Sequence, residues 1–156
     1  MLHRTLTVAF ALALAGTTNA HADDDWFPPV TDPTVEAECG ACHMAFQPSM
    51  LPARSWRAVM AGLDDHFGEN AVLDAATASL IEDRLVAGAA DAGGRSSEVL
   101  YGLPADAVPL RISDTPWWRG EHDEIRASAY DRPRVGSKAN CVACHAAAAR
   151  GIYEDD

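Results

Sequence analysis

Two copies of one five-residue pattern contain all four cysteines of the chain. The first copy runs from Cys39 to His43 and the second from Cys141 to His145. This C-x-x-C-H pattern is typical of c-type haem attachment, in which two thiols bond to the porphyrin vinyl groups and the histidine binds the iron from one face. The repeat therefore predicts two covalently bound c haems, attached through Cys39, Cys42, Cys141 and Cys144, with His43 and His145 as proximal iron ligands.

Two other uses of paired cysteines fit the sequence less well. A structural zinc site built from two C-x-x-C pairs does not need a histidine directly after each second cysteine. A thioredoxin-like redox pair would lie beside a βαβ unit, and the sequence shows no strand pattern. Haem attachment is the interpretation that uses both cysteines and the histidine of each motif.

Each predicted iron needs a sixth ligand, and two histidines are left to supply it. Outside the first 22 residues, His66 and His122 are the only histidines besides the proximal pair. A histidine on an apolar helical face is more often a core residue than a ligand, but here each half of the chain has one iron and one spare histidine. We expect His66 to bind the first iron and His122 the second, with a swap between the halves left open.

Methionine is the competing sixth ligand, because Met/His ligation is common in cytochromes c and raises the potential. Met44 adjoins the proximal His43 and Met50 follows it by only seven residues, which leaves Met60 as the rival of His66. The second half has no methionine. Bis-histidine ligation predicts low potentials for both haems and leaves no open position for a substrate, so we do not expect an enzyme.

The N-terminus has the features of an export signal. Arg4 precedes an apolar run over residues 6–15, and Ala20-His21-Ala22 forms an A-x-A cleavage site. The apolar run is short for a transmembrane helix, so a retained membrane anchor is the less favoured alternative. We predict a signal peptide over residues 1–22, cleaved after Ala22, and a periplasmic mature protein that does not insert into the membrane.

Helical spacing predicts a mostly α fold with two haem domains. In residues 23–91 the first motif is followed by predicted helices from Ser55 to Gly68, carrying Met60 and His66, and from Ala75 to about Ala89. This is the order of elements in a class I cytochrome c, and it predicts such a domain over residues 23–91. A Gly/Ser-rich segment then marks the boundary to a second domain over residues 92–156.

The helix expected to position the second distal histidine begins at Pro116, after a capping Asp114 or Thr115. On it, Trp118, His122 and Ile125 recur at helical spacing.

The second motif is expected on a last helix from Ser137 to about Gly151. Only eleven residues follow His145, so the distal wall of this haem must come from earlier residues, most simply from 105–134. We therefore predict a small, unusual C-terminal haem domain, with its C-x-x-C-H near the chain end and its distal histidine upstream.

Acidic residues outnumber basic ones, 23 to 12, for a net charge of −11. Residues 23–91 hold 13 acidic and 3 basic residues, whereas residues 92–156 hold 10 and 8. Such a chain is poorly suited to bind nucleic acid or an anionic membrane. Either the first half presents an acidic docking face to a basic partner, or the basic residues of the second half solvate its surface and pair with haem propionates.

Short segments around and between the motifs form an ordered series along the chain. They read ECGACH (38–43), LPARSW (51–56), HFG (66–68), LPAD (103–106), PLRI (109–112), TPWW (115–118), HDEI (122–125) and VGSKANC (135–141). In this order they resemble the dihaem cytochrome c family of bacterial periplasmic electron-transfer proteins, over nearly the whole mature length.

The resemblance implies two covalent c haems, both bis-histidine, in a class I-like first domain and a second domain of unusual fold. It also implies partners: a small oxygen-binding cytochrome c, known as sphaeroides haem protein, as electron acceptor and a membrane cytochrome b as donor. We therefore expect a relay of electrons through two haems. The alternatives, a small dihaem redox enzyme or a ligand-binding haem protein, require a distal histidine that leaves its iron.

Overall fold

The structure is a computed structural model that describes residues 26–93 and 97–153. Within these ranges the chain forms helices and turns, and the only β-type pairings are isolated bridges, Trp26 with Ile152 and His66 with Glu69. The predicted mostly α fold is confirmed. The predicted signal peptide, residues 1–22, lies outside the described residues. In the described part, no helix is both long and apolar enough to cross a membrane.

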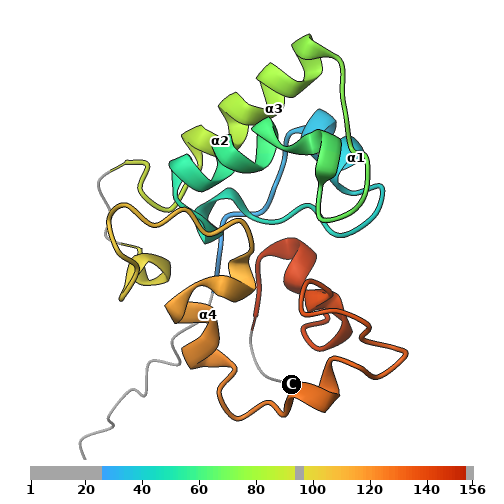
Figure 1. Ribbon diagram of the computed structural model, residues 1–156, viewed down its shortest axis with the longest axis vertical. Coiled ribbons are helices and arrows are strands. Elements are labelled where there is room, and N and C mark those ends of the chain that lie inside the picture. Colours follow the sequence, from blue (N-terminus) through green and yellow to red (C-terminus); the bar gives the residue numbers. More distant parts are fainter. Residues whose placement is uncertain (1–25, 94–96, 154–156) are drawn as a thin grey trace, which may run out of the picture.

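Three α-helices form the half of the molecule that is drawn at the top of Figure 1. They are α1 (Pro33–Cys39), α2 (Ala53–Ala61) and α3 (Ala75–Ala87). Asp32 accepts hydrogen bonds from the first turn of α1, and Asp74 does the same for α3. Carboxylates at these cap positions satisfy backbone N–H groups that a helix leaves unpaired.

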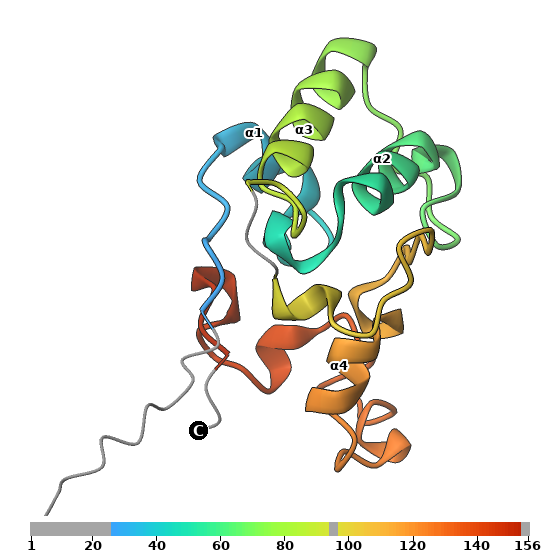
Figure 2. The same cartoon turned by 90° about the vertical axis from the view of Figure 1, so that its left-hand side faces the viewer.

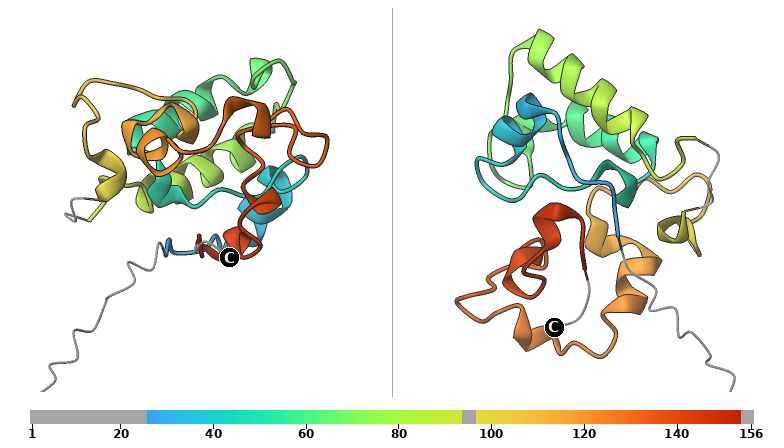
Figure 3. Two further views of the ribbon diagram at one scale, coloured as in Figure 1. Left: turned by 90° about the horizontal axis from the view of Figure 1, so that it is seen from below. Right: turned by 180° about the vertical axis from the view of Figure 1, so that it is seen from behind.

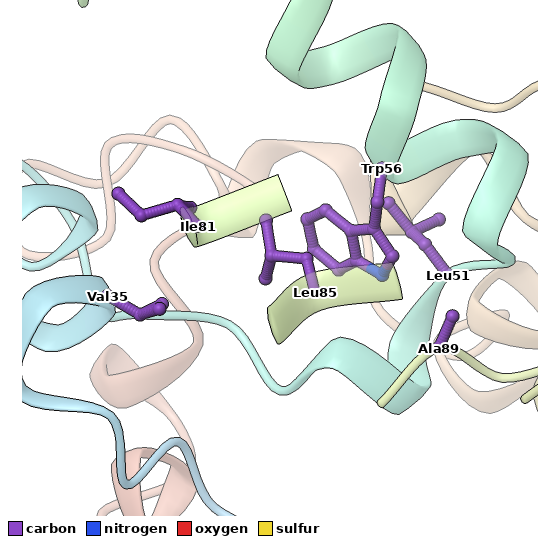
Figure 4. Close-up of a cluster of buried hydrophobic side chains, with 6 residues drawn as sticks. All are labelled: Val35, Leu51, Trp56, Ile81, Leu85 and Ala89. Carbon is purple, nitrogen blue, oxygen red and sulfur yellow. The ribbon is translucent and has the colours of Figure 1, made fainter. Parts of the chain in front are cut away.

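A compact hydrophobic cluster holds these helices together and fixes the loop that follows the first haem motif (Figure 4). The Trp56 ring of α2 lies in this cluster, and its Nε1 donates to the carbonyl of Pro48 at 2.7 Å. The indole thus buries apolar area and also anchors the short 3-10 turn η1 (Pro48–Met50). The cluster comprises Val35, Leu51, Trp56, Ile81, Leu85 and Ala89.

Helix α2 is shorter than the sequence predicted. It begins at Ala53, directly after Pro52, and ends at Ala61, where Gly62 breaks the helix. The chain then turns through the 3-10 element η2 (Leu63–Asp65), and the backbone N–H of His66 donates to the Glu69 carbonyl at 2.7 Å. The expectation that Met60 and His66 share one helix is therefore wrong.

Over residues 97–153 the second half contains one short α-helix, α4 (Pro116–Glu121), capped by Thr115 as predicted. Because α4 ends before His122, the apolar stripe expected from Trp118 to Ile125 is not formed, and Ile125 is 48 % exposed. The other elements are single 3-10 turns: η3 (Glu98–Leu100), η4 (Ile112–Asp114), η5 (Ala127–Ala129), η6 (Cys141–Ala143) and η7 (Ala148–Arg150).

The last helix predicted from Ser137 to Gly151 is absent; the second motif instead lies on η6, and a separate turn, η7, follows it. Gly151 ends η7 in the left-handed conformation, with φ of 79°. The adjoining backbone is fixed from outside the segment, since the Gly151 carbonyl accepts from Phe27 N–H at 2.8 Å.

Long-range hydrogen bonds join the two halves. The Arg54 guanidinium of α2 donates to the carbonyl of Ala107 at 2.6 Å, in the loop before α4. The segment that leads from Trp26 into α1 begins beside Ile152, at the end of the turn that follows the second motif, and Figures 2 and 3 show it running between the two halves. The two haem motifs are thus tied to one another by elements far apart in sequence.

Candidate haem-binding sites

The first site brings His43 and His66 together, as the sequence predicted. Helix α1 ends at Cys39, so the motif leaves the helix as a turn, and η2 delivers His66 from the other side. The two imidazole centroids lie 6.2 Å apart, with ring planes 22° from parallel. Imidazole nitrogens bind metal ions at about 2 Å, so two rings on opposite sides of one iron have centroids roughly 6 Å apart.

The ring of His43 is oriented by its neighbours. Its Nδ1 lies 2.7 Å from the carbonyl oxygen of Met44, and its face stacks on Phe46 with centroids 4.7 Å apart. Because a carbonyl oxygen only accepts, Nδ1 is the protonated nitrogen and Nε2 keeps its lone pair for a metal.

The surroundings of His66 favour the neutral form of its imidazole. Partial burial, together with the neighbouring His43, lowers the pKa of His66 below its usual value. Met60, the rival ligand, packs against the hydrophobic cluster of the first half. The structure therefore places the imidazole of His66 beside the proximal histidine, and it gives Met60 a packing role.

The second site is a cavity of about 230 Å³ between α4 and the second motif. Its walls include both cysteines of that motif and the pair His122 and His145, whose ring centroids lie 6.1 Å apart with planes at 80°. This separation also matches two imidazoles on one iron. The lining comprises Met50, Trp117, Trp118, Glu121, His122, Tyr130, Val135, Ser137, Lys138, Asn140, Cys141, Cys144, His145 and Tyr153.

Helix α4 positions His122 through Trp118. The imidazole stacks on the buried indole with centroids 4.1 Å apart and planes at 12°. Its Nδ1 lies 2.9 Å from the Trp118 carbonyl oxygen, so Nδ1 donates and Nε2 is the nitrogen that would bind a metal. His122 is the residue directly after the helix, which lets its side chain fold back over the last turn.

The four cysteines fit haem attachment better than the alternatives. All of them are free thiols, and among the described residues no group of three or more His, Cys, Asp or Glu side chains could hold a metal ion. Burial raises the pKa of Cys39, and it raises that of Cys141 to about 11. The described residues therefore form no zinc site. They do form a cavity in which Cys141 and Cys144 lie beside two histidines.

The sequence argument took the distal wall of the second site from residues 105–134, and it missed two lining residues that lie beyond the segment leading into the motif. Met50 reaches the cavity from the first half, and Tyr153 reaches it from the tail beyond the second motif. No local pattern indicates Met50, because its contact with Tyr153 joins positions 103 residues apart. Tyr153 is an aromatic residue eight positions after His145. This spacing is a weak signal that the segment after the motif packs against the second site.

A family model described as dihaem cytochrome c matches residues 35–153. The chain belongs to the dihaem cytochrome c family. Membership implies two c-type haems, for which the four cysteines provide the attachment motifs, and a role in haem-based electron transfer.

Solved structures of dihaem cytochromes c have the same fold. One from Rhodobacter sphaeroides is 48 % identical, with a TM-score of 0.74, covering 80 % of this chain and 98 % of that one. A second structure of the protein purified from this organism has 46 % identity, a TM-score of 0.67 and the same coverage. The Shewanella baltica protein is 36 % identical, with a TM-score of 0.64, covering 78 % and 86 %. A comparison with curated protein sequences gives no significant match.

Proposed function

We propose that this dihaem cytochrome c is a periplasmic relay that passes electrons through two bis-histidine haems to a partner haem protein. The observation that carries the proposal is the pairing of imidazoles at both motifs. His43 lies opposite His66 and His122 opposite His145, at centroid distances of 6.2 and 6.1 Å. Each distance matches that expected for two imidazoles bound to one metal ion from opposite sides.

The haem iron supplies one-electron chemistry when bound, and the protein determines its potential through the axial ligands. Nδ1 of His43 and Nδ1 of His122 donate to backbone carbonyls, which makes these imidazoles better electron donors to a metal. Imidazole on both faces gives a lower potential than the Met/His pair. Two filled axial positions favour electron transfer over substrate binding, and support a role other than that of an enzyme.

The electron acceptor we propose is a small oxygen-binding cytochrome c with a basic docking face. The electron donor to this protein is then a membrane cytochrome b. Support comes from the surface around the first distal ligand. Asp64, Asp65 and Glu69 are exposed on either side of His66, and the Phe67 side chain beside it is 46 % exposed. Acidic residues around an apolar centre suit transient docking near a haem, because complementary charge speeds encounter.

Stopped-flow mixing of the reduced protein with the oxidised partner tests this function. We expect oxidation of both haems, at a second-order rate that falls steeply as the ionic strength rises. Asp64→Asn with Glu69→Gln should slow the reaction at low salt. The same charge change at other exposed positions, Asp83→Asn with Asp106→Asn, should slow it less. A rate indifferent to salt would refute the acidic docking face, and failure to reduce the partner would refute the relay.

A further inference from the structure

Gln47 is a buried polar side chain that connects the two haem motifs. It follows His43 by four residues, and it is 0 % exposed. Its Nε2 donates to the carbonyl of Ala148 at 2.8 Å, three residues beyond the second motif. Its Oε1 accepts from the Tyr153 hydroxyl at 2.7 Å. A buried amide satisfied at both ends is costly to disturb, so this link fixes the position of Tyr153.

Tyr153 carries the link to the second proximal ligand. Its ring lies 5.4 Å from the ring of His145, with planes at 60°. The Tyr153 hydroxyl is the donor in its bond to Gln47, because an amide oxygen can only accept. The hydroxyl also lies 3.8 Å from Sδ of Met50, in the same loop as Gln47. The phenol ring is thus anchored at its hydroxyl while the ring itself contacts the imidazole at a tilted angle.

His145 differs from His43 and His122 in how its ring is fixed. Nδ1 of His43 and Nδ1 of His122 lie within hydrogen-bond distance of backbone carbonyls. Nδ1 of His145 is buried and has no hydrogen-bond partner among the described residues. A ligand histidine normally uses this second nitrogen to set its ring orientation. At His145, packing must set the ring orientation instead, and the Tyr153 ring is an aromatic neighbour that contacts it.

We propose that Tyr153, anchored by Gln47, is the positioning residue that sets the ring orientation of His145. The loop after the first haem motif thereby controls an axial ligand of the second haem. This inference rests on the proposed bis-histidine function. It assigns to Gln47 and Tyr153 a role that the haem motifs alone do not predict.

The orientation matters because the angle between two axial imidazole planes affects the electronic state of a low-spin ferric haem. Planes that cross at 80°, as for His122 and His145, bring two iron d orbitals close in energy and give a strongly anisotropic spectrum. Planes 22° apart, as for His43 and His66, separate those orbitals. Rotation of His145 therefore changes the spectrum and the potential of the second haem only.

Tyr153→Phe in the full-length holoprotein tests the proposal, because it removes the anchor and keeps the ring and the Gln47 bond to Ala148. We expect the electron paramagnetic resonance signal of the second haem and its NMR-detected haem methyl shifts to move, and its midpoint potential to change. Gln47→Leu should produce the same pattern where it folds. The matched control is Tyr130→Phe, which removes a hydroxyl from the same cavity that has no hydrogen-bond partner among the described residues.

A Tyr153→Phe spectrum identical to that of the wild type and of Tyr130→Phe would overturn the proposal, and so would equal shifts at both haems. Failure of the proposed function looks different: the wild-type protein would then show a high-spin haem. Unchanged variants in a wild type with two low-spin haems would remove only the role of Tyr153 and Gln47.

Discussion

At both iron positions, one imidazole is oriented by a carbonyl of its own chain segment. His43 uses the carbonyl of the next residue, Met44, and His122 uses that of Trp118, four residues earlier. Each contact fixes the tautomer, with the proton on Nδ1, and makes Nε2 the nitrogen that would bind iron. Such contacts also raise the basicity of the ligand and so stabilise the ferric state. Both haems are therefore expected to have low potentials.

Replacing one distal histidine at a time tests the pairing. In His122→Ala the second haem should become high-spin while the first stays low-spin, because the imidazole 6.1 Å from His145 is lost. In His66→Ala the reverse is expected. Absorption and electron paramagnetic resonance spectra of each variant measure the spin state of both haems.

Met60→Leu is the control for this pair of variants and should leave both haems low-spin. If His122→Ala instead changed the first haem, the histidines would be swapped between the halves. If Met60→Leu made the first haem high-spin, the thioether and not His66 would be its ligand.

At the scale of elements, α4 presents the second distal histidine through a buried cap. The Thr115 side chain is 0 % exposed; its Oγ1 accepts from the Trp118 N–H at 3.2 Å and donates to the Ile112 carbonyl at 2.8 Å. The cap thus fixes the first turn of the helix and the indole on which His122 stacks. Six residues of helix carry little stability of their own, so these contacts define its direction.

Thr115→Val keeps the shape of the side chain and removes both hydrogen bonds. We expect the free energy of unfolding to fall by about 0.5–2 kcal/mol, the usual cost of losing a cap. Thermal and denaturant unfolding followed at the haem absorption bands give this value. Thr34→Val makes the same chemical change in the first turn of α1, where Asp32 is the cap, and should cost less. Equal losses in the two variants would contradict the role of Thr115.

Local chemistry made some elements predictable and left others out of reach. The start of α4 could be predicted because a threonine hydroxyl accepts from an unpaired backbone N–H at a cap, and proline lacks the N–H that the first helical residue would leave unpaired. The structure confirms Thr115 as the cap and Pro116 as the first residue. The predicted ends of α2 and α4 were wrong. The helical spacing of apolar residues continues past Ala61 and Glu121, but the chain leaves the helix there and turns to place His66 and His122. The turn η7 after the second motif was also missed, since contacts from Phe27 and Gln47, far away in sequence, hold it.

The site shows the same division. The cysteines and proximal histidines were proposed from a five-residue pattern, and the distal histidines from a count of what remained. Met50 and Tyr153 could not, because each lines the cavity through a fold that brings the loop after the first motif onto the chain end.

At the scale of the whole molecule, the first described residues and the last ones form one structure. Phe27 packs against Trp117 and Tyr153 with centroids 5.5 and 5.6 Å away, and its backbone N–H donates to Gly151. A Cβ at Gly151 would collide with the carbonyl oxygen of Phe27. A segment that precedes the first motif therefore packs against two residues that line the second haem site, Trp117 and Tyr153.

Gly151→Ala tests the close contact between Phe27 and the turn that ends at Gly151. The left-handed φ of 79° disfavours a side chain, and the collision with Phe27 adds to it, so we expect a loss of stability of roughly 1–3 kcal/mol. The second haem should be disturbed more than the first in its spectrum and potential. Gly136→Ala is the matched control, since its φ is 69° and a Cβ there meets no atom within 4 Å. A loss no larger than in this control would contradict the close approach of Phe27.

The central claim is that both irons carry histidine on both faces, and one measurement tests it most directly. It is the absorption spectrum of the oxidised and the dithionite-reduced holoprotein, with the reduced sample recorded before and after addition of carbon monoxide. We predict low-spin bands for both haems and no change with carbon monoxide, since neither iron has an open or labile position. A high-spin band, or a haem that binds carbon monoxide, would contradict the claim.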